Sequence, residues 1–192
     1  DSSLLACLFP KRSVLTLHGL VEIDQKINGR GHMNALHVLV FRLMFGLTRQ
    51  FVRHVIAISP YVFSVFKWPL RRRIWLIPNM VEELYFLRSG RTAEPDADSL
   101  RVITVSQISP LKNTLVLIEA IQVLRDLLGP RSITLDIVGD GCHTLYGERC
   151  TEFVKKQNLC DIVTFHGNLP SEQIRDLLRR SSVFVLCSLH EN

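Results

Sequence analysis

Cysteine is sparse in this 192-residue chain and follows no recognisable framework. The five cysteines are an odd number and widely spaced, with no C-x-x-C pair and no histidines at zinc-ligand spacing. A disulfide scaffold and a structural zinc site both require regular spacing of such residues. The sequence therefore argues against both, and we expect buried thiols in a reducing compartment.

Long apolar runs and low-complexity tracts are also missing. The most apolar stretch, residues 36–47, is about a dozen residues long and contains Arg42, whereas a membrane span needs about twenty apolar residues. Hydrophobic residues make up 47% of the chain and charged residues 21%, which is typical of globular proteins. The composition excludes disorder. Because the chain starts at Asp1 and stops directly after the apolar run 183–187, we expect a fragment of a longer protein.

Positive charge is concentrated in the first half. Residues 1–91 hold 13 Lys and Arg against 5 Asp and Glu, and residues 92–192 hold 10 against 13. This imbalance indicates either a solvated basic face or an anionic partner such as a phospholipid surface or a phosphorylated substrate. Nucleic acid is disfavoured, because no aromatic residues interleave the arginine cluster 71–73 to form a stacking platform.

Short β-branched runs alternate with helical patterns along the chain, as in βαβ units on a parallel sheet. The expected strands are residues 13–17, 55–59, 73–77, 102–105, 134–138, 162–165 and 183–187. The expected helices are residues 34–48, 60–66, 114–127, 147–157 and 171–180. We predict an α/β protein with two Rossmann-like domains, residues 1–90 and 100–192, joined by a linker at residues 91–99. The linker lies in the segment 87–99, where apolar periodicity lapses and Gly, Pro and Asp accumulate.

Polar residues follow several expected strands, where parallel sheets bind their ligands. His18 follows the first strand, and Lys112 stands just before the long helix, where a lysine and free backbone N–H groups suit a diphosphate. Each has a plainer interpretation: His18 as a structural residue and Lys112 as a solvated one. The G-x-x-x-x-G-K phosphate loop is absent. Gly139, Gly141 and Gly167 fit either ligand approach or ordinary turns with positive φ.

Taken in order, these segments resemble a known enzyme family. The blocks are HG after a strand, HVIAIS, IPNMVEELYF, VSQISPLKN, DIVGDG, VTFHGNLP and SSVFVLCSLHEN. From about Ser13 to Asn192 the chain resembles glycosyltransferase family 4, the retaining, nucleotide-sugar-dependent enzymes of GT-B architecture. The resemblance implies an acceptor site mostly in the first Rossmann-like domain and a donor site mostly in the second.

The resemblance also assigns roles to individual residues. His18 corresponds to the family's histidine facing the donor sugar, and Glu191 to the first glutamate of its E-x7-E motif, which contacts the transferred sugar. Lys112 corresponds to the lysine on the donor diphosphate. The remaining implied donor-binding residues are Ser106 and Gln107, Gly139 and Gly141 of a glycine turn, and Gly167 and Leu169 near the nucleotide base. Gln107 departs from the family, which commonly has arginine there.

The implied partners are a nucleotide sugar and a glycan or lipid-linked acceptor, with no nucleic acid, cofactor or metal. The implied location is the cytoplasm, with peripheral contact to an anionic membrane through the basic first half. Since the second glutamate of the E-x7-E motif would lie beyond Asn192, we expect the chain alone to be inactive. Two alternatives stay open: another GT-B enzyme such as a nucleotide-sugar epimerase, and a non-catalytic binding subunit, which Gln107 suggests.

Overall fold

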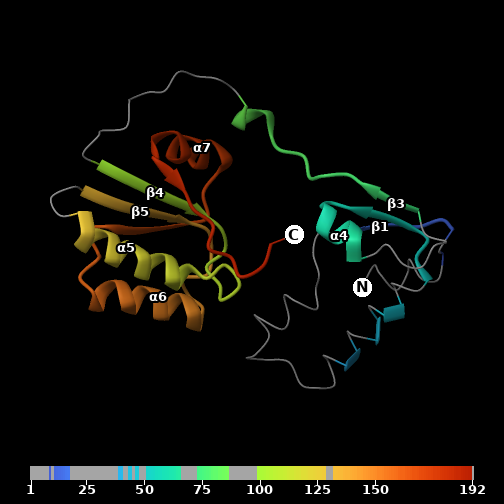
Figure 1. Ribbon diagram of the computed structural model, residues 1–192, viewed down its shortest axis with the longest axis horizontal. Coiled ribbons are helices and arrows are strands. Elements are labelled where there is room, and N and C mark those ends of the chain that lie inside the picture. Colours follow the sequence, from blue (N-terminus) through green and yellow to red (C-terminus); the bar gives the residue numbers. More distant parts are fainter. Residues whose placement is uncertain are drawn as a thin grey trace. The chain divides into compact units, whose positions relative to one another are not determined.

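The protein consists of two compact units, each built on a parallel sheet (Figure 1). The computed structural model describes residues 9, 11–17, 39–40, 43–44, 46–47, 51–65, 73–86, 99–128 and 132–191. The first unit comprises residues 1–80 and 190–192, and the second comprises residues 81–189. The expected linker, residues 91–99, lies outside the described residues except for Ser99, which begins a strand.

The first unit contains a three-stranded sheet in the order β1-β2-β3. Its described elements are β1 (Val14–Leu17), β2 (His54–Ala57), α4 (Pro60–Val65) and β3 (Arg73–Leu76). Val55, Ala57 and Val62 are fully buried and form the centre of its core. Helix α4 starts at a Ser-Pro step, where the Ser59 hydroxyl accepts a hydrogen bond from the Val62 amide at 3.2 Å. Ser59 therefore caps the start of α4, and Pro60 occupies its first position.

The second unit contains a four-stranded parallel sheet in the order β6-β5-β4-β7. Its strands are β4 (Ser99–Val105), β5 (Ser132–Val138), β6 (Val163–Gly167) and β7 (Val183–Phe184). Its helices are α5 (Thr114–Leu128), α6 (Leu145–Lys156) and α7 (Ser171–Arg180). Helices α5 and α6 cover one face of the sheet and α7 lies on the other (Figure 1). The strands are all parallel, but the order in which they are added reverses at β4: β5 and β6 lie on one side of it and β7 on the other, as in a Rossmann-like sheet.

Side-chain periodicity explains the core of this unit. Ile133, Leu135 and Ile137 alternate along β5 and are buried on the face that meets α5 and α6. Leu117, Ile118 and Ile121 form the buried stripe of α5, which confirms the helix expected at residues 114–127 and makes it amphipathic. Burial of each such side chain stabilises the fold by roughly 1.5–3 kcal/mol.

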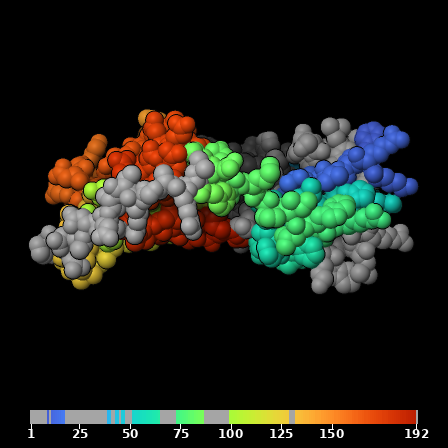
Figure 2. Space-filling model, turned by 90° about the horizontal axis from the view of Figure 1, so that it is seen from above, coloured from blue at the N-terminus to red at the C-terminus, as the bar shows by residue number. Residues whose placement is uncertain are grey.

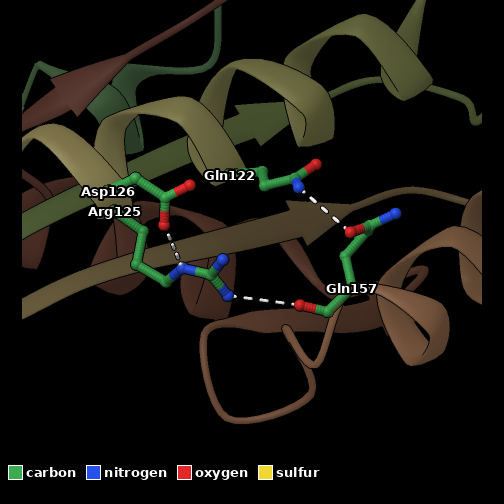
Figure 3. Close-up of polar contacts among 4 residues, drawn as sticks. All are labelled: Gln122, Arg125, Asp126 and Gln157. Atoms are coloured by element: carbon green, nitrogen blue, oxygen red, sulfur yellow. Dashed lines mark hydrogen bonds and ion pairs between the residues drawn. The ribbon is translucent and has the colours of Figure 1, made fainter.

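Polar contacts tie the last turns of α5 and α6 together (Figure 3). The Gln122 amide nitrogen donates to Gln157 Oε1 at 3.0 Å, and Arg125 donates to the Gln157 carbonyl oxygen at 3.2 Å and to Asp126 Oδ1 at 3.0 Å. Because crossover helices run antiparallel to the strands, these contacts lie toward the amino ends of the sheet. They are remote from the strand ends where ligands bind.

A short helical segment begins the second unit and packs against α7. This segment, η2 (Glu83–Tyr85), lies beside α7, and the Ser171 hydroxyl donates to Glu82 Oε1 at 3.4 Å. In Figure 2 the green atoms of this region border the orange-red atoms of α7. The sequence patterns did not predict this helical turn.

Several expected elements have different bounds in the structure, and two of these differences have a clear physical cause. Strand β7 covers Val183–Phe184 rather than 183–187, and its two residues are exposed rather than buried. The reason is that, among the described residues, β7 pairs only with Val102 and Ile103 of β4 and forms the edge of the sheet. Helix α6 begins at Leu145 rather than at Gly147, because the Thr144 side chain accepts a hydrogen bond from the Gly147 amide and caps the helix start.

The cysteines only partly follow expectation. None of the four described cysteines is in a disulfide. Cys150 is fully buried, Cys142 and Cys187 are half-buried, and Cys160 is exposed in the turn between α6 and β6. The expectation of buried thiols is therefore wrong for Cys160. Among the helices of the described part of the chain, none combines the length and apolar character needed to cross a bilayer.

Candidate functional site

A pocket of about 360 Å³ opens at the carboxyl ends of β4, β5 and β6 in the second unit. It is lined by residues 105–107, 138–140 and 168–169 and by Ile174 of α7. This is the edge of an α/β sheet at which ligands generally bind. The structure thus gathers the expected residues Ser106, Gln107, Gly139 and Leu169 around one pocket.

Backbone hydrogen bonds lock the first two loops of the pocket together. The Ser106 amide donates to the Val138 carbonyl at 2.9 Å, and the Ile108 amide donates to the Asp140 carbonyl at 2.7 Å. Asp140 Oδ1 in turn accepts from the Gly141 amide at 2.7 Å. The loop after β4 therefore continues the ladder between β4 and β5 past the last strand residues.

Two glycines permit this close approach. Gly139 has φ 140°, and a β-carbon there would collide with the carbonyl oxygen of Ser106. Gly141 has φ 120°, and a β-carbon there would lie 2.5 Å from the carbonyl oxygen of Ile108. Positive φ and the lack of space both exclude a side chain at these positions. The glycine turn is thus explained by backbone packing in the wall of the pocket.

Gly167 has a different role. Its φ is 67°, but a β-carbon there would meet nothing within 4 Å. Its carbonyl oxygen accepts a hydrogen bond from the Gly139 amide at 2.8 Å. Glycine is favoured here by the left-handed backbone rather than by crowding. From this turn the chain continues into Asn168 and Leu169 of the pocket wall.

Lys112 lies on the loop after β4, half-buried, but is not among the residues lining the pocket. Its amide donates to the Ser109 hydroxyl at 3.4 Å, and the Asn113 amide donates to the Ser109 carbonyl at 3.0 Å. Asn113 adopts a left-handed conformation, with φ 56°. The Leu111 carbonyl accepts from the Leu189 amide at 2.8 Å, so the chain after β7 braces the same loop.

The start of α5 offers fewer N–H groups than the sequence suggests. The Leu115 amide donates to the hydroxyl oxygen of Tyr146 at 3.0 Å, and the Asn113 amide is bonded to Ser109. The expectation of free backbone N–H groups beside Lys112 is therefore wrong for these two. The physical reason is that α6 packs its Tyr146 against the first turn of α5.

Three titratable groups of the second unit are held neutral by burial. Burial raises the pKa of the Cys150 thiol to about 11. Burial, with a further contribution from the Asp140 carboxylate, raises the pKa of Cys142. Burial likewise raises the pKa of the Tyr146 phenol above its usual value. None of these three groups is thus poised as a nucleophile at neutral pH.

The pocket lining is nearly neutral. Asp140 is the one charged residue among its lining residues, and Gln107 stands where a cation was expected by resemblance. Within the described residues, no group of three or more His, Cys, Asp or Glu side chains could hold a metal ion. The chemistry that the lining itself supports is binding through backbone and neutral polar groups.

Within the described part of the chain, four expected site residues do not line this pocket: Lys112, Gly141, Gly167 and Glu191. His18 lies outside the described residues. Glu191 is exposed and belongs with the first unit, as does its neighbour His190, whose ring meets Tyr61 edge-on at 5.3 Å. Gly141 and Gly167 are next to the pocket, bonded to its lining residues.

Five lining residues were not named as site residues from the sequence: Val105, Val138, Asp140, Asn168 and Ile174. Asp140 and Asn168 directly follow Gly139 and Gly167, so the rule that polar residues after parallel strands face ligands would have found them. Ile174 comes from α7 and reaches the pocket through tertiary packing alone, for which no local pattern exists.

Comparison with known proteins identifies related sequences and folds. A family model described as "Glycosyl transferases group 1" matches residues 91–192. No curated protein sequence matches the chain. The structure is similar to sucrose-phosphate synthase from Thermosynechococcus elongatus, with a TM-score of 0.73 and 19% identity over 99% of this chain and 49% of that one.

It is also similar to HepE of Anabaena in complex with UDP and glucose, with a TM-score of 0.69 and 19% identity over 97% of this chain and 49% of that one. The chain spans about half the length of these proteins. At such identities the likeness establishes the fold, and it confirms the expected GT-B class of α/β protein with Rossmann-like parallel sheets.

Proposed function

Because the chain belongs to the group 1 family of glycosyl transferases, we propose that its second unit binds a nucleotide-diphosphate sugar in the pocket at the ends of β4, β5 and β6. The proposed reaction moves the sugar to a glycan or lipid-linked acceptor with retention of configuration, as in glycosyltransferase family 4. We propose a hexosyl transfer that requires neither a cofactor nor a metal ion.

The observation that carries the proposal is the pocket itself. Its volume of about 360 Å³ lies within the range of small-molecule sites, and it sits where α/β sheets bind nucleotides. Because Gly139 and Gly141 carry no side chain, the loops after β4 and β5 pack closely against each other beside the pocket. The HepE structure contains UDP and glucose, which supports a nucleotide sugar as the ligand class.

Lys112 supplies the chemistry that this reaction needs most. A nucleoside diphosphate leaves readily once its developing negative charge is stabilised, and an ammonium group on the neighbouring loop does this without a proton donor. The bracing of Leu111 by Leu189 and of the Lys112 amide by Ser109 holds that loop in place. We propose His18 and Glu191 as the residues that face the transferred sugar.

A second candidate function is a non-catalytic, nucleotide-sugar-binding subunit. Gln107 replaces the arginine common in family 4, and the residues that line the pocket include no cation. Diphosphate binding would then rest on Lys112 and backbone groups, with less stabilisation of the leaving group. A nucleotide-sugar epimerase is distinguished from both by product analysis in the absence of an acceptor.

Titration calorimetry of the chain with UDP, GDP and ADP tests the ligand class. We expect one diphosphate to bind, and the matching monophosphate to bind more weakly. Leu169→Glu places a carboxylate in the pocket wall and should abolish binding, whereas Leu127→Glu, at a side chain 75% exposed on α5, should not. Equal binding by both variants, or none by the unmodified chain, contradicts the proposal.

The basic first half leads us to propose a cytoplasmic protein that contacts an anionic membrane carrying its acceptor. Lys11 and Arg12 are exposed, as are Lys155 and Lys156 in the second unit. Co-sedimentation with phosphatidylserine vesicles should occur at low salt and disappear at high salt. Charge reversal at Lys11 and Arg12 should weaken it more than reversal at Lys155 and Lys156, and absence of binding at low salt refutes this contact.

A further inference from the structure

We propose that Asp136 and His166 form a positioning pair that holds the pocket wall at residues 167–169, and thereby tunes nucleotide binding. Neither residue lines the pocket, and neither was singled out by the sequence patterns. The consequence for nucleotide binding rests on the proposed function, whereas the positioning itself does not.

The first observation is an irregularity in the sheet. Strands β5 and β6 pair Asp136 with Thr164 and Ile137 with Phe165, but Val138 then pairs with Gly167. His166 is therefore an extra residue in β6, a β-bulge, located one residue before the turn into the pocket wall. Bulges bend a strand and redirect the residues after them, and they recur beside active sites.

The second observation is a side-chain contact across this bulge. His166 Nε2 lies 2.6 Å from Asp136 Oδ1, within hydrogen-bonding distance. Both side chains are largely shielded from water, with exposures of 25% and 23%. A contact of a ring N–H with a carboxylate is stronger than a bond between neutral groups and is weakly screened at such depth. It joins the inserted residue to the neighbouring strand.

The third observation is the path of the chain after the bulge. The Gly167 carbonyl accepts from the Gly139 amide at 2.8 Å, and Gly167 turns with φ 67° toward Asn168 and Leu169. A β-carbon at Gly167 would touch nothing, so steric contact does not set the direction of the chain at this point. The direction of the chain after Gly167 therefore depends on the register of β6 against β5. His166 is the residue that shifts this register, and its contact with Asp136 holds it in place.

A regular ladder is the competing arrangement. If β6 continued without a bulge, Val138 would pair with His166, and the residues after it would move by one position along the sheet. A one-residue slip changes which face every subsequent side chain occupies. Leu169 would then leave the pocket wall. The Asp136–His166 contact favours the bulged register over this alternative.

The pair lies outside the hydrophobic core cluster of the second unit. Its loss should therefore change the pocket wall more than it changes global stability. A matched control exists at the far end of the same unit, where Gln122 donates to Gln157 at 3.0 Å (Figure 3). Breaking that bond removes a side-chain contact of similar length without touching the pocket.

The test compares His166→Leu, His166→Gln and Gln122→Leu in the full chain. Amide exchange at Gly139, read by NMR, should accelerate about tenfold in His166→Leu, return toward the unmodified rate in His166→Gln, and stay unchanged in Gln122→Leu. Affinity for the nucleoside diphosphate that the unmodified chain binds should fall about five- to tenfold in His166→Leu alone.

Unchanged exchange at Gly139 in His166→Leu overturns the positioning role, whether or not the chain binds nucleotide. Accelerated exchange with unchanged affinity overturns the link to binding. If exchange accelerates as expected but the unmodified chain binds no nucleoside diphosphate, the proposed function fails and the positioning role stands.

Discussion

The backbone of Gly139 passes so close to the carbonyl oxygen of Ser106 that no β-carbon fits between them. The contact brings the loops after β4 and β5 together, where Ser106 also donates to the carbonyl of Val138. Both loops contribute to the pocket. The wall of the candidate site is therefore a packed backbone surface, whose shape depends on the absence of a side chain.

Gly139→Ala should disrupt this surface. We expect the free energy of unfolding to fall by about 2 kcal/mol or more, since a backbone atom must move. Nucleotide binding should be lost with it. The control is Gly167→Ala, where φ is also positive but the space is open, and the cost should be about 1 kcal/mol. Urea denaturation of both variants measures the difference, and equal costs would contradict the crowding at Gly139.

Lys112→Ala should weaken binding of a nucleoside diphosphate by about tenfold or more, because an ammonium–phosphate contact is lost. The unphosphorylated nucleoside should be much less affected. Lys155→Ala, at an exposed lysine in the last turn of α6, provides the charge-matched control. Calorimetric titration compares the variants. Equal affinities for Lys112→Ala and Lys155→Ala would remove Lys112 from the site.

Tyr146→Phe should destabilise the start of α5. The Tyr146 hydroxyl is the acceptor for the Leu115 amide, and its removal should cost about 1 kcal/mol in the free energy of unfolding. Amide exchange at Leu115 should accelerate at the same time. Tyr85→Phe, in η2, is the comparison for loss of a hydroxyl elsewhere. An unchanged exchange rate at Leu115 would contradict the hydrogen bond from the Leu115 amide to the Tyr146 hydroxyl.

The buried thiol of Cys150 should make the free energy of unfolding depend on pH in the alkaline range. Burial raises its pKa from 9.0 to about 11, so the unfolded chain loses the thiol proton first. The stabilising contribution is therefore complete below about pH 9 and is lost as pH rises through 11, amounting to roughly 3 kcal/mol. Denaturation of the unmodified chain and of Cys150→Ala should reveal this difference, and parallel pH profiles would contradict it.

Exposed Cys160 should react with thiol reagents well before Cys150.

Much of the fold could be predicted because the sheets are built from local patterns. The alternation of Ile133, Leu135 and Ile137 and the stripe of α5 follow directly from side-chain periodicity. The rule that ligands bind at the ends of parallel strands then pointed to Ser106 after β4 and to Gly139 after β5, and both line the pocket. The apolar run at residues 183–187 led us to expect a longer, buried strand. That expectation was wrong for β7, because an apolar run does not reveal how many neighbouring strands it will have.

The parts of the site that depend on tertiary contacts could not be predicted. Ile174 reaches the pocket from α7, and Tyr146 occupies the start of α5 from α6. The bulge at His166 depends on the pairing partner of each residue in β6, which no pattern within β6 records. These features arise where separate elements meet, whereas the predictable ones arise within a single element.

Mapping a bound nucleoside diphosphate onto the chain by NMR tests the central claim most directly. Titration of UDP, or of GDP or ADP if calorimetry favours one of them, should shift the amide signals of Ser106, Gly139 and Asn168 together, with one dissociation constant. The amide of Gln157, at the far end of the unit, should not move. Shifts concentrated elsewhere in the second unit, or none with any of the three diphosphates, would contradict the assignment of this pocket as the donor site.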